Sequence, residues 1–219
     1  MKYRSVFDII GPVMVGPSSS HTAGAVRIGQ IARKLFGKKI EKAYIHFYGS
    51  FAKTYKGHAT DVAVLAGLMG LSTYDPRIPD AFSLAKQKGL EYKFFEEKAL
   101  SPHPNTVQIE MFSGSDKCDV TGISLGGGLV QISEVDGFPL KLSGDAPSLL
   151  IFHKDVYGTI APILTLFAQN KINVSHMEVS RLEKGRLALM AVETDQPASE
   201  EIIKEILNMP NIQRVVRLS

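Results

Sequence analysis

Cysteine is nearly missing from this chain of 219 residues, which contains Cys118 and no other. A single cysteine rules out an internal disulfide, and it cannot by itself hold a zinc ion or an iron–sulfur cluster. Any cluster chemistry would therefore require cysteines from another chain.

Long apolar runs and dense runs of charge are missing as well. No stretch approaches the length of a membrane span, and the opening MKYRSVFDII has too short an apolar segment and too early an aspartate for a signal peptide. The net charge of +3 comes from Lys and Arg scattered through both halves, without aromatic interleaving. We therefore expect a cytoplasmic protein whose partners are small molecules or proteins, with no nucleic acid and no membrane among them.

The composition, 44% hydrophobic and 21% charged, is that of an ordinary soluble protein with a buried core. Turn-forming residues at 144–147 divide the chain, so we expect two domains, residues 1–146 and 148–219. In the second, apolar periodicity predicts strand 148–153, helix 158–169, strands 173–181 and 186–193, helix 199–208 and strand 212–218. That βαββαβ order is typical of the ferredoxin-like fold, with two helices on one face of a four-stranded sheet.

The larger first domain is predicted to mix helices and strands, which makes the whole chain α+β. The sequence indicates three helices. The first spans about residues 22–36, the second directly follows the sequence GHATD, and the third spans residues 79–88. The strand YIHFYG precedes the second helix, and five strands follow the third: EYKFFEE, TVQIEMF, CDVTGIS, LVQISEV and PLKLS.

Two short motifs each place a histidine at an expected helix start. In GPSSSHT, any of Ser18, Ser19 and Ser20 can cap the helix, and His21 falls within the first turn, just before Thr22. A helix start gathers free N–H donors and partial positive charge, so it suits an anion. An imidazole added there can move a proton near neutral pH.

The second motif, GHATD, repeats the arrangement. Thr60 or Asp61 can cap the following helix, and either can orient His58. A capped helix with an exposed histidine explains each motif alone. Their recurrence favours one shared site, of which these motifs look like half.

Three smaller features can join this site. His103 stands between two prolines, followed by Asn105, in a loop that either presents the imidazole rigidly or is simply a rigid surface turn. Residues 126–128 are all glycine, suited to an anion, to close packing of another chain or to a flexible hairpin. Residues 48–50, Tyr-Gly-Ser, offer hydroxyl donors, unless the tyrosine belongs to the core.

Two familiar chemistries are disfavoured. The nucleophile-elbow pattern GxSxG is absent, which argues against hydrolysis by a serine triad. Metal ligation by His21 and His58 lacks a third ligand of obvious spacing, so we expect no metal in this chain.

Five stretches closely resemble the beta subunit of the bacterial two-subunit, iron–sulfur-dependent L-serine dehydratase: MKYRSVFDIIGPVMVGPSSSHTAGAVRIG, YGSFAKTYKGHATD, HPNT, SLGGG and LKLSGDAPSLLIFHKDVYGTIAPI. The resemblance spans essentially the whole chain. Its first part is similar to the serine dehydratase beta domain, a relative of an extra substrate-binding domain of some phosphoglycerate dehydrogenases. Its second part is similar to an ACT domain.

The resemblance implies conversion of L-serine to pyruvate and ammonia without pyridoxal phosphate. It also implies a [4Fe-4S] cluster, held by cysteines of an alpha subunit, whose open iron acts as Lewis acid on the β-hydroxyl. The single cysteine agrees with a beta chain that adds residues around the cluster and is inactive alone.

Within that reaction a histidine suits proton removal from Cα. We predict His58 first and His21 second as the base. Substrate binding is assigned to the first motif, the second motif and the proline-flanked loop, through Ser18, Ser19, Ser20, Thr22, Thr60, Asp61, His103 and Asn105.

The ACT-like part suggests regulation or self-association. A possible amino-acid site consists of the strand-to-helix loop and the entrance of the next strand, with Asp155, Gly158, Thr159 and Asn173. The sheets could equally pair without a ligand. A different class of function is a non-catalytic amino-acid-binding regulatory or scaffolding protein, which would bind serine without any cysteine-rich partner.

Overall fold

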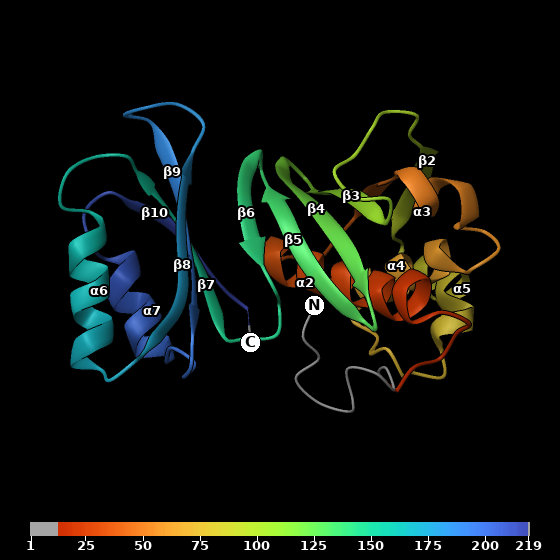
Figure 1. The fold of residues 1–219 in the computed structure, drawn as a ribbon, viewed down its shortest axis with the longest axis horizontal. Coiled ribbons are helices and arrows are strands. Elements are labelled where there is room, and N and C mark those ends of the chain that lie inside the picture. The colour runs from red at the N-terminus through yellow and green to blue at the C-terminus, as the bar shows by residue number, and fades with distance from the viewer. Residues whose placement is uncertain (1–12, 219) are drawn as a thin grey trace. The chain divides into compact units, whose positions relative to one another are not determined.

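The computed structural model describes residues 13–218, and the chain divides into two compact units after Asp136 (Figure 1). Both units mix helices and strands, which confirms the α+β class. The expected domain boundary near residue 147 stays a prediction, because the division into compact units gives the short strand β6 (Phe138–Leu142) to the second unit. No helix within residues 13–218 has the length and apolarity to cross a membrane.

The first unit is a sheet with helices packed on one face. Its strands lie in the order β2 (Glu91–Glu96), β1 (Lys42–Phe47), β3 (Thr106–Ser113), β4 (Asp116–Gly126) and β5 (Leu129–Val135). Strands β1 and β2 are parallel, and the other pairs are antiparallel. Alternate residues of β1 are fully buried, as expected for strands covered on one face.

The helices of this unit match the expected segments, with one addition. Helices α2 (Gly24–Phe36), α4 (Thr60–Leu68) and α5 (Ala81–Lys88) were predicted from apolar spacing, and a 3₁₀ turn (Ile78–Asp80) leads into α5. Helix α3 (Gly49–Thr54) was not predicted. Its six residues are too short to show a helical apolar period, so no sequence signal separated it from a loop.

Helices α2 and α4 cross at close range because glycines face each other at their contact. A Cβ added at Gly67 would lie 2.1 Å from the carbonyl oxygen of Val26, and one at Gly29 would lie 2.5 Å from that of Val64. Each histidine motif lies at the start of one of these two helices, so the close packing of α2 on α4 fixes the positions of both motifs.

The second unit confirms the βαββαβ order. Strands β10 (Ile212–Leu218), β7 (Ser148–Lys154), β9 (Leu187–Thr194) and β8 (Val174–Arg181) form an antiparallel sheet in that order, and helices α6 (Ile160–Gln169) and α7 (Glu200–Leu207) cover one face (Figure 1). Strand β8 stands at the edge. The core between sheet and helices is apolar and includes Leu149, Ile151, Ile163, Phe167, Met190, Val192 and Ile206.

Candidate active site

The serine turn, residues 16–22, begins its helix as expected, but through a π-helical turn. Ser18 is the N-cap, and its Oγ accepts from the backbone N–H of His21 at 3.1 Å. Residues Ser19–Ala23 form the π turn that leads into α2. Such turns are rare in proteins as a whole, but many of those that occur lie at functional sites.

His21 is held at both ring nitrogens by serine hydroxyls. Its Nδ1 lies 3.0 Å from Ser20 Oγ and its Nε2 lies 3.3 Å from Ser50 Oγ, at the start of α3. The Ser20 hydroxyl is in turn 3.3 Å from Ser18 Oγ. A hydroxyl can donate or accept, so this chain of serines accommodates either tautomer of the imidazole.

The two motifs meet in space. The rings of His21 and His58 pack edge to face with centroids 4.7 Å apart, and the buried Thr22 donates through Oγ1 to the His58 carbonyl at 3.2 Å. His58 lies in the turn between α3 and α4 and is exposed, whereas His21 is half-buried against Phe51. Their recurrence in sequence thus corresponds to one cluster.

Capping of α4 differs from the expectation for Thr60. The N-cap position is Ala59, in the left-handed region with φ 55°, and no side chain caps the helix. Thr60 is completely buried, and its Oγ1 has no partner within the described residues. Asp61 accepts from the N–H of Val62 at 2.8 Å, within the first turn of the helix. Neither side chain is hydrogen-bonded to the His58 ring in residues 13–218, so the orientation of His58 comes from packing against His21.

Left-handed backbone at a residue with a side chain is a strained conformation. Ala59 joins His58 to a helix start whose N–H groups stay uncapped, and the strain is held by Thr60 N–H, which donates to the carbonyl of Tyr55 at 2.8 Å. Strain of this kind gathers at functional sites.

The proline-flanked loop packs against the same cluster through its backbone. The Pro104 carbonyl accepts from Ser50 N–H at 2.7 Å. Gly49, with φ 56°, lies so close to the backbone of Pro104 that an added Cβ would be 2.7 Å from the Pro104 carbonyl oxygen. The His103 ring stays within its own turn, where Nδ1 accepts from Asn105 N–H at 3.1 Å. The loop therefore positions Ser50, and through it His21.

One functional position escaped the sequence reading. Ser124, on β4, is fully buried and donates from Oγ to the Ser20 carbonyl at 2.8 Å, which ties the sheet to the serine turn. Its N–H donates to the carbonyl of Asn105 at 2.9 Å. The glycines 126–128 form the adjacent hairpin turn, fixed by Arg27, whose Nη1 donates to the Gly128 carbonyl at 2.8 Å. A lone serine in a strand carries no sequence signal for such a role.

Burial sets the electrostatics of the cluster. It lowers the pKa of His21 below 6.5, and the neighbouring His58 lowers it further. Burial also raises the pKa of Asp61, against the backbone N–H of Val62, which lowers it. His21 is consequently held neutral near pH 7, as a proton acceptor must be.

A pocket of about 630 Å³ adjoins the cluster. It is bounded by Gly49, Pro104 and residues 96–101, and neither histidine is among its lining residues. The histidines instead face the surface beside it.

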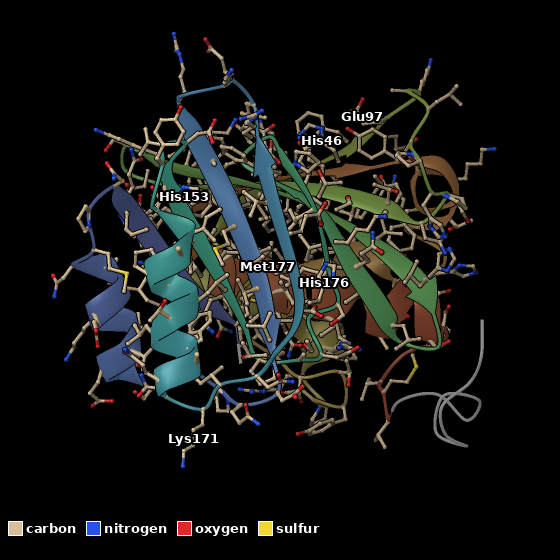
Figure 2. The ribbon with its side chains drawn as sticks, turned by 60° about the vertical axis from the view of Figure 1, so that its left-hand side comes forward. His46, Glu97, His153, Lys171, His176 and Met177 are labelled. Carbon is tan, nitrogen blue, oxygen red and sulfur yellow. The ribbon has the colours of Figure 1, made fainter. Side chains whose placement is uncertain are left out.

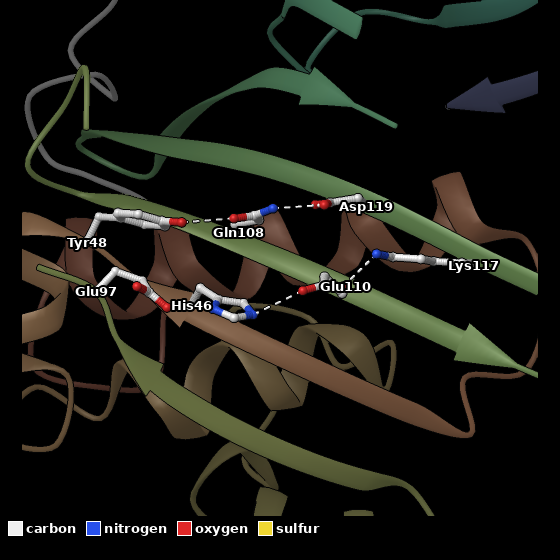
Figure 3. Close-up of polar contacts among 7 residues, drawn as sticks. All are labelled: His46, Tyr48, Glu97, Gln108, Glu110, Lys117 and Asp119. Atoms are coloured by element: carbon white, nitrogen blue, oxygen red, sulfur yellow. Dashed lines mark hydrogen bonds and ion pairs between the residues drawn. The ribbon is translucent and has the colours of Figure 1, made fainter. Parts of the chain in front are cut away.

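A second polar cluster lies on the same sheet, on the face away from the helices (Figure 3). The two ring nitrogens of His46 lie 2.8 Å from Glu97 and 3.2 Å from Glu110. Lys117 pairs with Glu110 and lowers its pKa, with the His46 contact adding to the effect. In parallel, Tyr48 donates to Gln108, which donates to Asp119. Tyr48 therefore belongs to this cluster, and of residues 48–50 only Ser50 touches His21.

In the second unit the structure separates the residues of the possible amino-acid site. Asp155 accepts from Arg181 and from the Gly185 N–H, each at 2.9 Å, at one end of the β8–β9 pair. These contacts lower its pKa. Asn173 donates to Asp195 at 2.7 Å, at the other end. Strand β8 separates them by about 23 Å, at the usual rise per residue. Within one chain they do not form a single site.

The other two residues of the possible site lie in the strand-to-helix loop, and the strand before this loop ends near a histidine that carried no expectation. Thr159 is buried and donates to the Val156 carbonyl at 3.1 Å, while Gly158, with φ 75°, faces open space. His153, at the end of β7, is 2% exposed, and its Nε2 has no partner within the described residues. A histidine inside an apolar strand carries no sequence signal of function.

Comparisons with known proteins agree with both halves. Residues 5–87 match the serine dehydratase beta chain family, and residues 148–211 match the ACT domain family. The chain is 51% identical to the probable L-serine dehydratase, beta chain of Bacillus subtilis over all of both chains. It is 33% identical to the L-serine dehydratase, beta chain of Peptoniphilus asaccharolyticus over 94% of this chain and 93% of that one. A D-3-phosphoglycerate dehydrogenase of Bacillus subtilis is 25% identical over 87% of this chain and 36% of its own. By its likeness to complete beta chains, this protein belongs to the L-serine dehydratase beta-chain family.

Proposed function

We propose that this chain is the beta subunit of an L-serine ammonia-lyase, which converts L-serine to pyruvate and ammonia in the cytoplasm. The observation that carries the proposal is the convergence of His21 and His58 beside the hydroxyls of the serine turn. That arrangement supplies anion-binding donors and a neutral imidazole within one cluster.

The part of the chain that the structure describes offers no group of ligands for the iron–sulfur cluster. Cys118 is completely buried in β4, opposite Met111, and residues 13–218 contain no group of three histidines, cysteines or carboxylates placed to hold a metal. We therefore assign the [4Fe-4S] cluster to cysteines of an alpha subunit, and the beta chain is inactive alone. The roles below concern only residues of this chain.

The serine turn binds the substrate carboxylate. Serine hydroxyls and the N–H groups at the start of α2 are the donors, and the partial positive charge of the helix start adds attraction. Ser124 fixes the position of the turn, because its hydroxyl donates to the Ser20 carbonyl. Asn105, whose carbonyl accepts from Ser124 N–H, stays a candidate contact of the substrate.

His58 is the first candidate for the base that removes the Cα proton. Its ring is exposed, and within residues 13–218 it contacts His21 without a hydrogen bond to either of its nitrogens. The nitrogens of His21, by contrast, already face two hydroxyls. His21 orients the ring of His58 and keeps it close to the serine turn.

The test is activity of the chain co-expressed anaerobically with a cysteine-rich alpha chain of L-serine dehydratase. We expect L-serine turnover only when both chains are present, and a fall in kcat of at least about a hundred-fold in His58→Gln. His176→Gln, an exposed histidine of β8, is the matched control and should keep full activity. Cluster content, measured by absorbance and iron analysis, should be equal in all variants.

Two outcomes would contradict the proposal. Full turnover by His58→Gln with an intact cluster would remove His58 from the mechanism. Serine binding by the chain alone, with no turnover in any pairing, would favour a non-catalytic amino-acid-binding protein.

The ACT domain is proposed to join two copies of the chain, with amino-acid binding between them. Strand β8 is an edge strand that carries Met177 (Figure 2). Met177 and Val179 are 40% and 42% exposed. Antiparallel pairing of two β8 edges about a twofold axis would bring the Asp155 end of one copy beside the Asn173 end of the other. That pairing accounts for the separation of these residues within one chain.

A further inference from the structure

A chain of side-chain hydrogen bonds runs through the ring of His21 and joins the serine turn to α3. Ser18 Oγ lies 3.3 Å from Ser20 Oγ, which in turn lies 3.0 Å from His21 Nδ1. On the other side of the ring, His21 Nε2 lies 3.3 Å from Ser50 Oγ, 29 positions further along the sequence. The hydrogen-bonding state of the serine turn therefore depends on a hydroxyl outside it.

The tautomer of His21 decides where the spare hydrogen of this chain lies. A neutral imidazole carries one N–H, and each hydroxyl carries one O–H. With the proton on Nε2, Nδ1 must accept from Ser20, and Ser20 must accept from Ser18. Both serine hydrogens of the turn are then used inside the chain, and the spare hydrogen is that of Ser50.

The other tautomer moves the spare hydrogen to the serine turn. With the proton on Nδ1, the ring donates to Ser20, and Ser50 donates to Nε2. The Ser18–Ser20 contact then needs only one of its two hydrogens, because Ser20 no longer donates to the ring. One hydroxyl hydrogen of the turn is left to donate outward.

An outward hydrogen at the serine turn is what a bound carboxylate requires. An ionised carboxylate accepts hydrogen bonds and can donate none. A hydrogen bond to an ionised acceptor is roughly twice as strong as one between neutral groups. Ser18 and Ser20 are both partly exposed, so a ligand can reach them. A carboxylate at the turn therefore favours the tautomer with the proton on Nδ1.

Ser50 is placed to supply the hydrogen at the far end of the chain. Its N–H donates to the Pro104 carbonyl at 2.7 Å, and its own carbonyl accepts from Thr54 Oγ1 at 2.7 Å. Among the described residues, His21 is the only hydrogen-bond partner of the Ser50 hydroxyl. The backbone of Ser50 is thus fixed, while its hydroxyl is left to serve the ring.

We propose that Ser50 is a positioning residue for substrate binding: it donates to Nε2 of His21, holds the ring proton on Nδ1 and so releases a hydroxyl hydrogen of the serine turn for the carboxylate. Ser50 acts through His21 and does not touch the substrate. Binding of the carboxylate and the tautomer of His21 are coupled, so each favours the other. The inference rests on the proposed function, because it takes the serine turn as the carboxylate site.

Nitrogen-15 NMR of the full chain, labelled at histidine, reads the tautomer directly, because protonated and unprotonated ring nitrogens differ in chemical shift. Spectra at about pH 7.5 are assigned with His21→Gln, since a His21 with a lowered pKa is neutral there. Sodium acetate and L-serine are added separately, with sodium chloride as the control for ionic strength. We expect both carboxylates to raise the ratio of Nδ1–H to Nε2–H at least about three-fold in the natural chain, and to change it little in Ser50→Ala.

Kinetics of the enzyme assembled with its alpha chain separate this role from a structural one. We expect Ser50→Ala to raise KM for L-serine about ten-fold or more and to change kcat less than about three-fold, because the loss falls on substrate binding. Ser50→Thr keeps a hydroxyl and should restore KM to within about three-fold of the natural value. Ser83→Ala, an exposed serine of α5, is the matched control and should change neither constant.

Three results would overturn the role of Ser50. They are a His21 tautomer that responds to neither carboxylate, an unchanged KM in Ser50→Ala, and a KM in Ser50→Thr as high as that in Ser50→Ala. A failure of the proposed function looks different. Absence of L-serine turnover, together with the expected tautomer response to acetate, would contradict the proposed reaction and still support the coupling of Ser50 to anion binding.

Discussion

The hydrogen bonds of single residues decide which histidine can act in the proposed reaction. His21 is held by Ser20 and Ser50 and is half-buried, while His58 presents an exposed ring against it. Burial lowers the pKa of His21, and the neighbouring His58 lowers it further, because a neutral His21 avoids two adjacent imidazolium charges.

The lowered pKa of His21 makes folding stability depend on pH. Below about pH 6.5 the unfolded chain binds a proton at this residue that the folded chain resists, so the contribution of neutral His21 is complete above that pH. It is lost progressively as the pH falls through the unfolded value towards the lowered one. We therefore expect the natural chain to lose unfolding free energy relative to His21→Gln when the pH is lowered from about 7.5 to about 5.5.

Urea unfolding at the two pH values measures this difference. His176→Gln is the control, since its ring is exposed. A difference between the natural chain and His21→Gln that stays constant over this range would show that His21 does not resist protonation in the folded state.

At the scale of elements, the packing of α2 on α4 holds the two motifs together. The backbones approach through Gly29 and Gly67, and no side chain fits between them. This packing fixes the start of α2 relative to the start of α4, so that Thr22 donates to the His58 carbonyl.

Gly67→Ala should therefore destabilise the chain. Its Cβ would lie 2.1 Å from the Val26 carbonyl oxygen, which belongs to a helix backbone and cannot move aside locally. Overpacking of this kind costs about 1–3 kcal/mol. Gly57→Ala is the matched control, because its Cβ would meet nothing nearer than 3.7 Å.

Thermal unfolding followed by circular dichroism compares the two variants. We expect a clear drop in Tm for Gly67→Ala and a much smaller change for Gly57→Ala. Equal Tm values for Gly67→Ala and the natural chain would mean that the helices separate at little cost.

At the scale of the whole molecule, the proposed function requires other chains. Residues 13–218 contain no group of three histidines, cysteines or carboxylates placed to hold a metal, and the ACT domain exposes an edge strand with apolar side chains. Met177 and Val179 lie opposite Val192 and Met190, which are core residues on the helix-covered face. A second β8 beside the first would extend both the sheet and this core.

Met177→Lys/Val179→Lys should dissociate the assembly. Two added charges at the pairing edge repel their copies across a twofold axis and remove apolar area. We expect light scattering after gel filtration to give at least a dimer for the natural chain and a smaller mass for the double variant. Gln213→Lys, exposed on the opposite edge strand β10, is the control and should leave the mass unchanged. A natural chain that stays monomeric at high concentration would contradict the pairing.

The sequence by itself determined the α+β class, the βαββαβ order of the second half and the helix that follows each histidine motif. These follow from local causes: apolar spacing, glycine at helix ends, and Ser18, whose side chain caps the first helix start. The sequence also predicted that the two histidine motifs share one site, because the same arrangement of histidine and capping residues occurs at both helix starts.

Only the tertiary structure decided which groups touch. Short α3 carries Ser50 to His21, and Ser124 reaches the serine turn from a strand more than a hundred residues away. Thr60, which with Asp61 was a candidate cap of α4, is buried, and its Oγ1 has no hydrogen-bond partner within residues 13–218. Asp155 is separated from Asn173. The physical reason is the same in each case: capping and periodicity depend on neighbours along the chain, whereas hydrogen bonds between distant segments depend on how the helices and the sheet pack.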